Sequence, residues 1–394
     1  MSPSPMRQSA EFSELTTIAV GGTAREMVSA THAKQLIDTA LEVWAGGENW
    51  LLLGGGSNTI VADDGFDGIV IRVATRGIER LRVEPDSPDR SGKVLLRVQA
   101  GESWDDVVRY TVEHGWAGIE ALSGIPGSSG AAPVQNIGAY GQELSSSLVA
   151  IEFLDYLSGE LRRIPAGELG LGYRTSALKQ GRLGVVVSVE LELDAGADDD
   201  GVGATALSRP IAYAQLASAL GVGIGDRVPL AEVRATVLEL RAAKGMLLSE
   251  SDPESVSAGS FFTNPIVSES FARTLPTDSP RWPIDDDPRL PVVTPLESFS
   301  PRDLEPRSTE GETVRSDQVK LSAAWLIENA GVKRGFSLPG SRASVSRKHS
   351  LAIVNRGGAT ADQVAELARY IQSRVLNEFG VILLPEPVLV GVHL

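Results

Sequence analysis

Short runs of apolar residues recur along the chain between glycine, proline and polar turn residues, a pattern typical of β-strands. The first two runs flank a glycine turn at residues 54–58, which indicates that the chain begins as an α/β or α+β fold. The runs that predict strands are Leu51–Leu53, Ile69–Ile71, Val149–Leu157, Gly184–Leu193, Leu351–Asn355, Val381–Leu384 and Val388–Val392.

Five other segments carry apolar residues at helical spacing. The strongest pattern lies in Ala361–Phe379, where the apolar residues fall on one face. The helix that begins after Ser103 has a capping signal, because Asp106 follows the serine at the third position. The predicted helices are 103–114, Ile211–Leu220, Pro229–Ala243, Ala323–Ala330 and Ala361–Phe379.

Three segments are too rich in turn-forming residues for regular elements. Residues 122–141 combine glycine, proline and small residues, which predicts a long ordered loop around a ligand. Residues 194–203 are acidic and predict a turn or boundary, with a new unit starting near Ala206. Between Pro265 and Pro306 lie nine of the 22 prolines, which predicts a long surface excursion rather than a packed helix or central strands.

The composition is that of a globular protein with more than one domain. The chain has 394 residues, 42% hydrophobic and 22% charged, enough for two or three domains with real cores. It carries 36 lysines and arginines against 51 aspartates and glutamates, a net charge of −15. This charge repels phosphate backbones, so we expect no nucleic-acid partner. An anionic small molecule would need local cations and backbone N–H groups.

The absence of cysteine excludes disulfides, thiolate nucleophiles and thiolate metal sites. The four histidines are scattered, so we expect no metal site. No apolar run approaches about 18 residues and the N-terminal residues lack an apolar signal region, which predicts a cytoplasmic protein without a membrane segment. The sequence leaves the oligomeric state open and is compatible with a monomer.

A first glycine-rich loop is a candidate for ligand binding. It follows a predicted strand, and its backbone N–H groups can surround an anion such as a pyrophosphate. It is not a dinucleotide-binding Gly-x-Gly-x-x-Gly motif, because Thr59 stands where the third glycine belongs. A tight turn without a ligand explains the segment equally well. The candidate residues are Gly54, Gly55, Gly56, Ser57 and Asn58.

A second loop repeats this chemistry about 70 residues later, and two such loops suit a long ligand with two phosphates and flat rings. Amide and hydroxyl groups that follow it can bond the polar edge of a planar heterocycle. Taken singly, each residue is more simply a structural turn residue. The candidates are Gly124, Ile125, Pro126, Gly127, Gly130, Gln135, Asn136 and Tyr140.

Several motifs in one order make the chain resemble the UDP-N-acetylenolpyruvoylglucosamine reductase family. They are LGGGSN, SGIPGSSGAAPVQNIGAYG, GYRTS, AGSFFTNP, KLSAAWLIENAG and LLPEPVLVG, and the similarity runs from about Leu15 to Val392. The resemblance implies an α+β fold. In it, a two-subdomain FAD-binding fold of the p-cresol methylhydroxylase (PCMH) and vanillyl-alcohol oxidase type precedes an α+β substrate-binding domain.

The resemblance also implies domain limits. The first FAD-binding subdomain would span 13–75 and be completed by 351–394, and the second would span 76–205. A nucleotide-sugar domain would span 206–350, including the proline-rich excursion at about 265–316.

The activity implied by the resemblance is a reduction in peptidoglycan precursor synthesis. NADPH would reduce a non-covalent FAD, which would pass hydride to the enolpyruvyl group of UDP-N-acetylglucosamine enolpyruvate and give UDP-N-acetylmuramate. By position in the family motifs, Arg174 would bind the carboxylate, Ser260 would donate the proton and Glu386 would stabilise the intermediate as a neutral acid. Without the resemblance these residues are a surface arginine, a turn serine and a solvated glutamate.

Four further residues match family positions near the substrate or the nicotinamide. Tyr213 resembles a tyrosine on a loop over the nucleotide sugar, and Lys244 resembles a lysine that meets phosphate. Asn264 and His349 complete the set of expected substrate-binding residues.

Two other functions stay open at the level of sequence. One is a flavin-dependent oxidase of another sugar or alcohol, in which the Ser260 and Glu386 motifs should be absent. The other is a non-catalytic protein that binds a flavin or a nucleotide sugar. The joint presence of Arg174, Ser260 and Glu386 favours the reductase over both.

Overall fold

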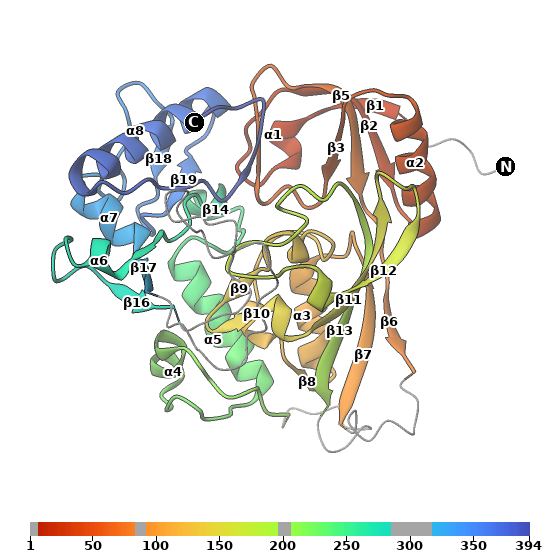
Figure 1. The fold of residues 1–394 in the computed structure, drawn as a ribbon, viewed down its shortest axis with the longest axis horizontal. Helices are drawn as coiled ribbons and strands as arrows, with labels where there is room; N and C mark the ends of the chain where they lie inside the picture. The colour runs from red at the N-terminus through yellow and green to blue at the C-terminus, as the bar shows by residue number, and fades with distance from the viewer. Residues whose placement is uncertain (1–6, 83–91, 196–205, 285–316) are drawn as a thin grey trace, which may run out of the picture.

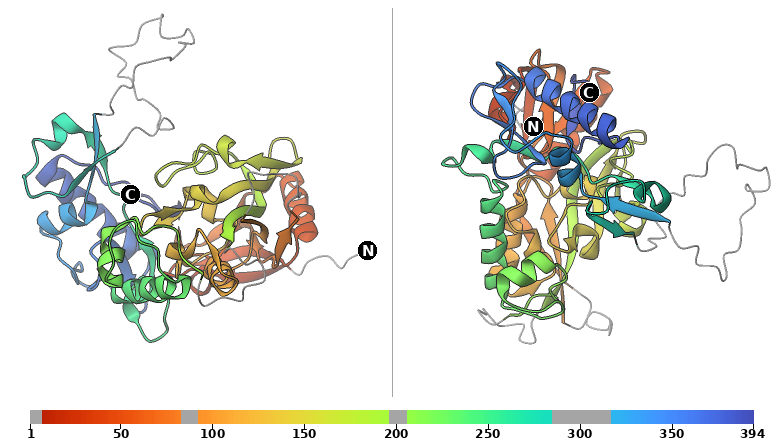
Figure 2. Two further views of the ribbon diagram at one scale, coloured as in Figure 1. Left: turned by 90° about the horizontal axis from the view of Figure 1, so that it is seen from below. Right: turned by 90° about the vertical axis from the view of Figure 1, so that its left-hand side faces the viewer.

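The computed structural model describes residues 7–82, 92–195, 206–284 and 317–394. Figure 1 shows three groups of elements around a common centre. A sheet from the N-terminal residues lies at the upper right, a larger sheet lies below it, and the C-terminal helices lie at the upper left. Helix α5 (Leu230–Ala243), drawn in green, lies below the C-terminal elements in Figure 1 and in the right-hand view of Figure 2.

The N-terminal sheet has four strands in the order β1-β2-β5-β3. The strands β2, β5 and β3 run parallel, and β1 is antiparallel to β2. Helix α2 covers one face, because its buried Leu36, Ala40 and Val43 pack in one core with Val28 and Ile71. The elements are β1 (Arg7–Glu11), α1 (Phe12–Leu15), β2 (Thr23–Ala30), α2 (Ala33–Ala45), β3 (Trp50–Leu53), β4 (Thr59–Val61) and β5 (Phe66–Val73).

The larger sheet is antiparallel, with the main order β12-β11-β13-β7-β6 and a short strand β8 beside β13. In β7 the residues Val94, Leu96 and Val98 are buried at every second position and pack against Trp104 of helix α3. The elements are β6 (Ile78–Leu81), β7 (Lys93–Gln99), α3 (Trp104–Glu113), β8 (Trp116–Ala117), β9 (Gly138–Ala139), β10 (Gln142–Glu143), β11 (Leu148–Asp155), β12 (Leu161–Pro165) and β13 (Gly184–Ala195).

Among the described residues, the remaining elements include two small three-stranded sheets and the helices α4 to α8. One sheet has the order β14-β19-β18 and the other β15-β17-β16. Helices α7 and α8 pack in a large C-terminal core. The elements are α4 (Ala214–Leu220), α5, β14 (Ser257–Ser260), β15 (Ile266–Ser268), α6 (Glu269–Ala272), β16 (Arg281–Pro283), β17 (Gln318–Leu321), α7 (Ala323–Asn329), β18 (Ala343–Val345), β19 (Ala352–Asn355), α8 (Ala361–Phe379) and β20 (Val388–Val390).

The end of the chain returns to its beginning. Strand β20 pairs in parallel with β4, which directly follows the first glycine loop. The side-chain amide of Asn355 donates to the carbonyl oxygens of Ile18 and Ala19 at 3.1 and 2.9 Å. These contacts place Glu386 beside the first glycine loop, although 328 residues separate it from Asn58.

The structure corrects two predicted elements. Residues 381–384 form no strand, because their carbonyl oxygens bond instead to other groups: that of Leu383 accepts from the Gln372 side chain, and that of Leu384 from the Thr263 N–H. The helix predicted from Ile211 begins only at Ala214, because the backbone of Ile211 is bonded to residues 225 and 226.

The described part of the proline-rich segment, residues 265–284, forms strands β15 and β16 and the short helix α6, whose Ala272 is buried. Strands β15 and β16 take the two edges of their sheet, with β17 at the centre. Pro283 therefore needs no ladder N–H on its outer side. The rest of the excursion, residues 285–316, and most of the acidic segment, residues 196–205, lie outside the described residues.

Candidate active site

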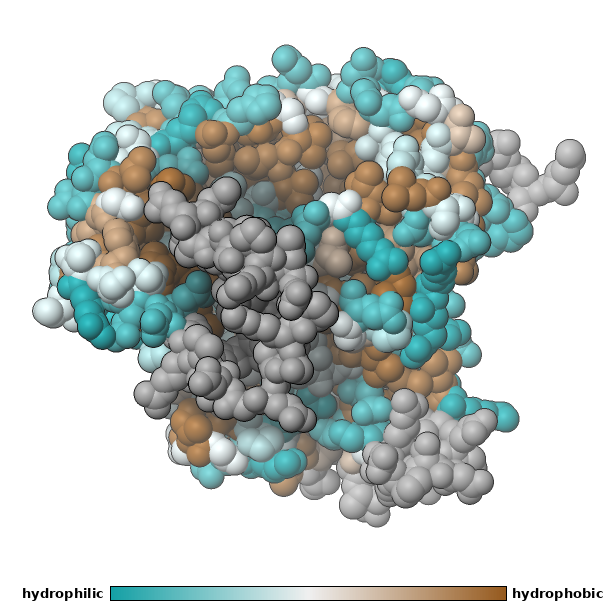
Figure 3. Space-filling model, in the orientation of Figure 1, coloured by the Kyte–Doolittle hydropathy of each residue, from teal (hydrophilic) through white to brown (hydrophobic). Residues whose placement is uncertain are grey.

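A cavity of about 740 Å³ lies where the three groups of elements meet. Its walls come from both glycine loops, the large sheet, the end of α5, strand β14 and the segment around Glu386. On the face seen in Figure 3, hydrophobic residues gather in the hollow between the C-terminal elements and the N-terminal sheet. The cavity thus brings together residues from positions 50 to 388.

The first glycine loop packs closely against the backbone of the second loop and of Leu15. A Cβ atom on Gly55 would lie 2.7 Å from the Cα of Gly127, and one on Gly56 would lie 2.0 Å from the carbonyl oxygen of Leu15. Gly56 also has φ of +63°. Side chains add to this contact, since the Ser57 hydroxyl donates to the Pro126 carbonyl oxygen at 3.0 Å. The two loops therefore form one unit, held by backbone packing.

Replacing Gly55 with alanine is expected to push the two loops apart. The new methyl group overlaps backbone atoms that cannot rotate away, a strain of about 1–3 kcal/mol by comparison with other overpacked sites. The measurement is the flavin content of the purified protein and the Kd for added FAD. Gly167→Ala is the matched control, because a Cβ there has no atom within 4 Å. Unchanged FAD affinity in Gly55→Ala would contradict the close-packing argument.

The second loop contributes most, but not all, of its predicted residues. Six line the cavity: Ile125, Pro126, Gly127, Gly130, Gln135 and Tyr140. Gly124 is not among the lining residues, because its N–H is donated to the Asp105 carboxylate at 2.6 Å. Asn136 is buried, and its amide bonds to Glu143, Ser145 and the Gly172 carbonyl oxygen. Both residues therefore hold the loop in place, and the structure puts neither of them in the wall of the cavity.

Gln135 and Asn58 connect the loops to the segment that contains Glu386. The Asn58 side-chain amide donates to Gln135 Oε1 at 3.1 Å and to the carbonyl oxygen of Glu386 at 3.3 Å. The N–H of Glu386 in turn donates to the Phe261 carbonyl oxygen at 2.8 Å. Two of the three catalytic candidates, Glu386 and Ser260, are thus tied to one backbone framework, since Phe261 follows Ser260 directly.

Arg174 and Glu386 form an ion pair in the cavity wall. Arg174 Nε lies 3.3 Å from Glu386 Oε1, and the same guanidinium donates to the Gly138 carbonyl oxygen at 2.7 Å. Arg174 lies in a tight turn between Gly172 and Thr175 with φ of +54°, an unfavourable conformation for a non-glycine residue. Asn136 and Tyr140 share this unusual conformation. Such strain tends to gather at functional sites.

The electrostatics of Glu386 favour a proton on its carboxyl group. Burial raises the pKa of Glu386, and the nearby cations Arg174 and Lys179 oppose that rise. Lys179 also lines the cavity, and partial burial lowers the pKa of its ammonium. Sequence reasoning missed Lys179, which lies five residues after Arg174 and just beyond the GYRTS motif.

A second group of cations lines the other side of the cavity. Lys244 Nζ lies 5.4 Å from the centre of the Tyr140 ring, and Tyr140 and Tyr213 meet edge to face at 6.0 Å. Burial, and then the charge of Arg241, lowers the pKa of Lys244. Arg241 was not predicted, but its position three residues before Lys244 places both on one side of a helix end.

Asn264 does not line the cavity, unlike the other predicted substrate residues Tyr213, Lys244 and His349. Its side-chain oxygen accepts from the Ala323 N–H at 2.9 Å, at the first turn of α7. This bond gives Asn264 a structural role. It also lies beside Tyr173, the neighbour of Arg174 in the chain.

His349 is expected to make folding stability depend on pH. Burial, and then the nearby cations Lys244 and Arg334, lowers the pKa of His349 to about 4 from 6.5. Because the unfolded chain then binds a proton that the folded chain excludes, stability falls as pH drops from about 6.5 toward 4, by up to about 3 kcal/mol.

The measurement is chemical denaturation at pH 7 and pH 4.5 of the wild type and His349→Asn. The variant should lose less stability between these pH values than the wild type. His393→Gln, at the exposed C-terminal end, is the control and should follow the wild type. Equal losses in all three proteins would show that His349 is not kept neutral by the fold.

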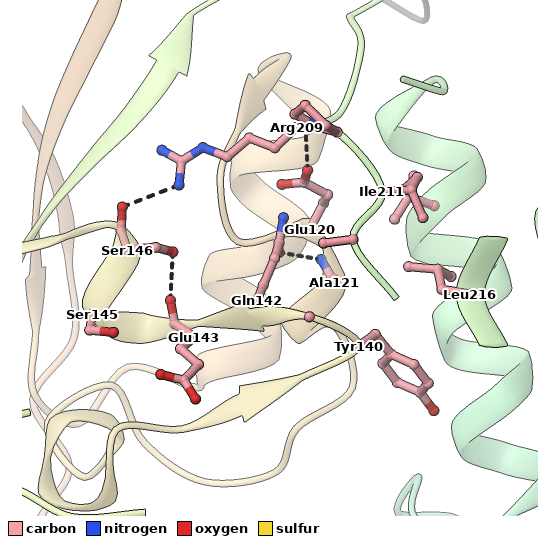
Figure 4. Close-up of a pocket in the computed structure, with 14 residues that line it drawn as sticks. Glu120, Ala121, Tyr140, Gln142, Glu143, Ser145, Ser146, Arg209, Ile211 and Leu216 are labelled. Carbon is pink, nitrogen blue, oxygen red and sulfur yellow. Dashed lines mark hydrogen bonds between the residues drawn. The ribbon is translucent and has the colours of Figure 1, made fainter. Parts of the chain in front are cut away.

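A smaller pocket of about 440 Å³ lies beside the cavity, with Tyr140 in both walls. Its polar groups are engaged with one another (Figure 4): the Glu120 carboxylate accepts from the Arg209 N–H at 2.8 Å, and Gln142 Oε1 accepts from the Ala121 N–H at 2.8 Å. Apolar residues such as Ile211 and Leu216 cover its other side. The wall of this pocket includes the turn between β9 and β10 that carries Tyr140.

Two kinds of feature are absent from the described residues. Within residues 7–82, 92–195, 206–284 and 317–394, no three histidine, cysteine, aspartate or glutamate side chains are grouped so that they could bind a metal ion. In the same residues, no helix has the length and apolar character needed to cross a bilayer.

Comparisons with known proteins agree with this geometry. Residues 24–165 match the family model described as "FAD binding domain". Residues 252–390 match the model described as "UDP-N-acetylenolpyruvoylglucosamine reductase, C-terminal domain". The FAD-binding range contains both glycine loops, and the second range contains Ser260 and Glu386.

Similar proteins extend over nearly the whole chain. UDP-N-acetylenolpyruvoylglucosamine reductase of Leifsonia xyli subsp. xyli is 58% identical over 97% of this chain and 98% of its own. The reductase of Saccharopolyspora erythraea is 44% identical over 95% of this chain and 93% of its own. The crystal structure of the reductase from Thermus caldophilus superposes with a TM-score of 0.59 at 25% identity, covering 98% of this chain and 99% of that one.

The FAD-binding domain and the reductases that the chain resembles over nearly its whole length place the protein in the class of FAD-dependent oxidoreductases. The chain belongs to the UDP-N-acetylenolpyruvoylglucosamine reductase family. The α+β fold and the FAD cofactor expected from the sequence are thereby confirmed. The two loops also fit FAD physically, because their glycines line the cavity and have no side chains of their own to cover the backbone there.

Proposed function

We propose that the protein catalyses the NADPH-dependent reduction of UDP-N-acetylglucosamine enolpyruvate to UDP-N-acetylmuramate, for peptidoglycan synthesis in the cytoplasm. The observation that carries the proposal is the Arg174–Glu386 ion pair in one cavity with Ser260, both glycine loops and the Arg241–Lys244 cations. The oxidation of another alcohol would require neither an arginine that binds a carboxylate nor a residue that donates a proton to carbon.

FAD would be held by the unit that the two glycine loops form. Ser57, Asn58, Gln135 and the exposed backbone of Gly54–Gly56 supply its polar contacts, and Ile125 with Pro126 supplies apolar ones. When bound, FAD takes a hydride from NADPH and passes a hydride to the terminal methylene carbon of the enolpyruvyl group.

Arg174 would bind the carboxylate of the enolpyruvyl group. Its planar guanidinium can donate two parallel hydrogen bonds, and its charge opposes the negative charge that develops when hydride adds to the double bond. A substrate carboxylate close to Glu386 would raise the Glu386 pKa further, since like charges repel. Glu386 would then act as a neutral acid that donates a hydrogen bond to the developing enolate oxygen.

Ser260 would supply the proton that completes the reaction. Hydride adds to the methylene carbon, the double bond breaks, and the neighbouring carbon takes the hydroxyl proton of Ser260. A serine hydroxyl is a weak acid, so the transfer depends on the carbanion character of that carbon. The proton on Ser260 is then replaced from water.

The diphosphate of the nucleotide sugar would bind Arg241 and Lys244. The cavity wall carries five cationic side chains, Arg174, Lys179, Arg182, Arg241 and Lys244, and one carboxylate, Glu386. This local excess offsets the net charge of −15 of the whole chain. Tyr140 and Tyr213 would lie against the sugar or base.

The test is NADPH consumption by the purified yellow protein with and without UDP-N-acetylglucosamine enolpyruvate, followed by nucleotide and flavin absorbance together. Turnover that requires the enolpyruvate would support the reductase. A flavin that NADPH reduces but only oxygen reoxidises would instead favour an oxidase. Failure of NADPH to reduce the bound flavin, with intact binding of the nucleotide sugar, would favour a non-catalytic binding protein.

A further inference from the structure

Gly124, where the second glycine loop begins, is held from two helices. Its N–H donates to Asp105 Oδ1 of α3 at 2.6 Å, and its carbonyl oxygen accepts from Arg241 Nε at the end of α5 at 3.1 Å. The φ of Gly124 is +70°, so only glycine is favourable there. Both backbone groups of this residue are therefore fixed by side chains far from it in sequence.

Asp105 is itself bound by α5. Arg234 Nη1 and Nη2 donate to Asp105 Oδ1 and Oδ2 at 2.7 and 2.9 Å, a parallel two-bond geometry. The Arg234 and Asp105 side chains are 13% and 33% exposed, so solvent weakens this pair less than a surface pair. Burial acts to raise the Asp105 pKa, but the bonds from Arg234 and Gly124 lower it overall.

Apolar packing closes the remaining side of Gly124. A Cβ atom on this glycine would lie 2.8 Å from Leu238 Cδ2 and 3.1 Å from Leu247 Cδ1. Leu238 belongs to α5, like Arg234 and Arg241. One face of α5 therefore contacts the start of the loop directly through Leu238 and Arg241, and indirectly through the bonds of Arg234 to Asp105. We refer to Asp105, Arg234 and Arg241 together as the Gly124 clamp.

The position of Gly124 governs the part of the loop that lines the cavity. Gly127, three residues later, accepts from the Trp104 N–H at 3.0 Å and lies against Gly55 of the first loop. A shift at Gly124 must therefore move Ile125 and Pro126 or break the contact between the loops. None of Asp105, Arg234 and Gly124 lines the cavity, so any influence on FAD acts through the loop.

We propose that Asp105 and Arg234 are positioning residues for FAD, which act by clamping the second glycine loop to helix α5. Helix α5 lies between residues 24–165 and 252–390, the two ranges that the family models match. The clamp thus makes FAD affinity depend on a helix outside the FAD-binding domain. By thermodynamic linkage, bound FAD must strengthen the attachment of α5 to the same degree.

The test is the Kd for FAD of deflavinated protein, measured by flavin fluorescence, in Asp105→Asn and Arg234→Met. Each should raise the Kd roughly tenfold to a hundredfold, the usual range of coupling between sites. The double variant should be little worse than either single one, because both disrupt one clamp. Arg234→Lys keeps the charge without the two-bond geometry and should fall between wild type and Arg234→Met.

Asp106→Asn is the matched control, since Asp106 follows Asp105 on the same helix and pairs with Arg109 at 3.1 Å in an exposed position. It should leave the Kd unchanged. A second readout is the rise in Tm that saturating FAD produces, which should shrink in the clamp variants. An unchanged Kd, with Tm lowered equally with and without FAD, would overturn the proposal and leave the ion pair a purely structural one.

Discussion

Replacing Ser260 with alanine is expected to slow the oxidation of the reduced flavin by the enolpyruvate substrate by roughly 10²–10⁴, the usual contribution of a general acid. Reduction of the flavin by NADPH should be unchanged, because hydride transfer to FAD needs no proton from Ser260. The two half-reactions are measured separately by stopped-flow absorbance of the flavin. Ser260 lines the cavity on strand β14, so the methyl group of alanine fits without repacking.

A second variant separates proton donation from shape. Ser260→Cys places a thiol, which can also donate a proton, at the same position. It should recover part of the rate of flavin oxidation that Ser260→Ala loses. Ser270, on the short surface helix α6, provides a serine-to-alanine control that should match the wild type. An equal loss in both half-reactions for Ser260→Ala would remove the proton-donor role and point to a general disturbance of the flavin site.

Replacing Arg174 with methionine is expected to lower kcat/KM for the enolpyruvate substrate by roughly 10²–10³, the effect of truncating one partner of a buried charge pair. The pH profile should change as well. Arg174 opposes the burial that raises the pKa of Glu386, so its removal should raise that pKa further. The limb of the profile that reports Glu386 should therefore move to higher pH. The measurement is kcat/KM for the substrate across pH at saturating NADPH.

Two controls isolate the role of Arg174. Arg174→Lys keeps the cation near Glu386 but loses the planar fork, so it should restore the pH profile more than the rate. Arg162→Met removes an exposed arginine that pairs with Glu160 and should change neither quantity. A large rate loss in Arg174→Met with an unmoved pH profile would show that Glu386 titrates independently of its partner.

Local signals in the sequence anticipated part of the site. A run of glycines such as Gly54–Gly56 can be recognised from the sequence alone. It indicates a close approach of two backbones, which a Cβ atom on Gly55 would prevent. The motif resemblance supplied Arg174, Ser260 and Glu386, all of which line the cavity. Their catalytic roles stay predictions until the variants are measured.

The sequence missed residues whose role depends on packing between distant elements. Arg241 is a single arginine near the end of a helix, and only the fold shows that it contacts Gly124, 117 residues earlier. Asn136 and Gly124 look like ligand-binding residues in a glycine loop, yet their polar groups bond to protein. No local pattern distinguishes a side chain that faces a ligand from one that holds the loop.

The sequence by itself determined α3 and α8 and their starts, whereas it did not predict α2 and placed the start of α4 three residues too early. Helix α8 follows from its apolar stripe and its cap, in which the Thr360 side chain accepts from the Gln363 N–H, and α3 follows in the same way from Ser103. These features depend on residues three or four positions apart, so a short window contains all the relevant contacts.

The tertiary structure alone decided the elements whose partners are remote. Residues 381–384 and 388–390 have similar apolar character, but only the second segment finds a free strand edge, at β4, and becomes β20. The same long-range closure brings Glu386 within 3.3 Å of Arg174. A strand needs a partner to satisfy its N–H and C=O groups, and a buried ion pair needs two distant side chains to meet. Those requirements are met only when the whole chain has folded.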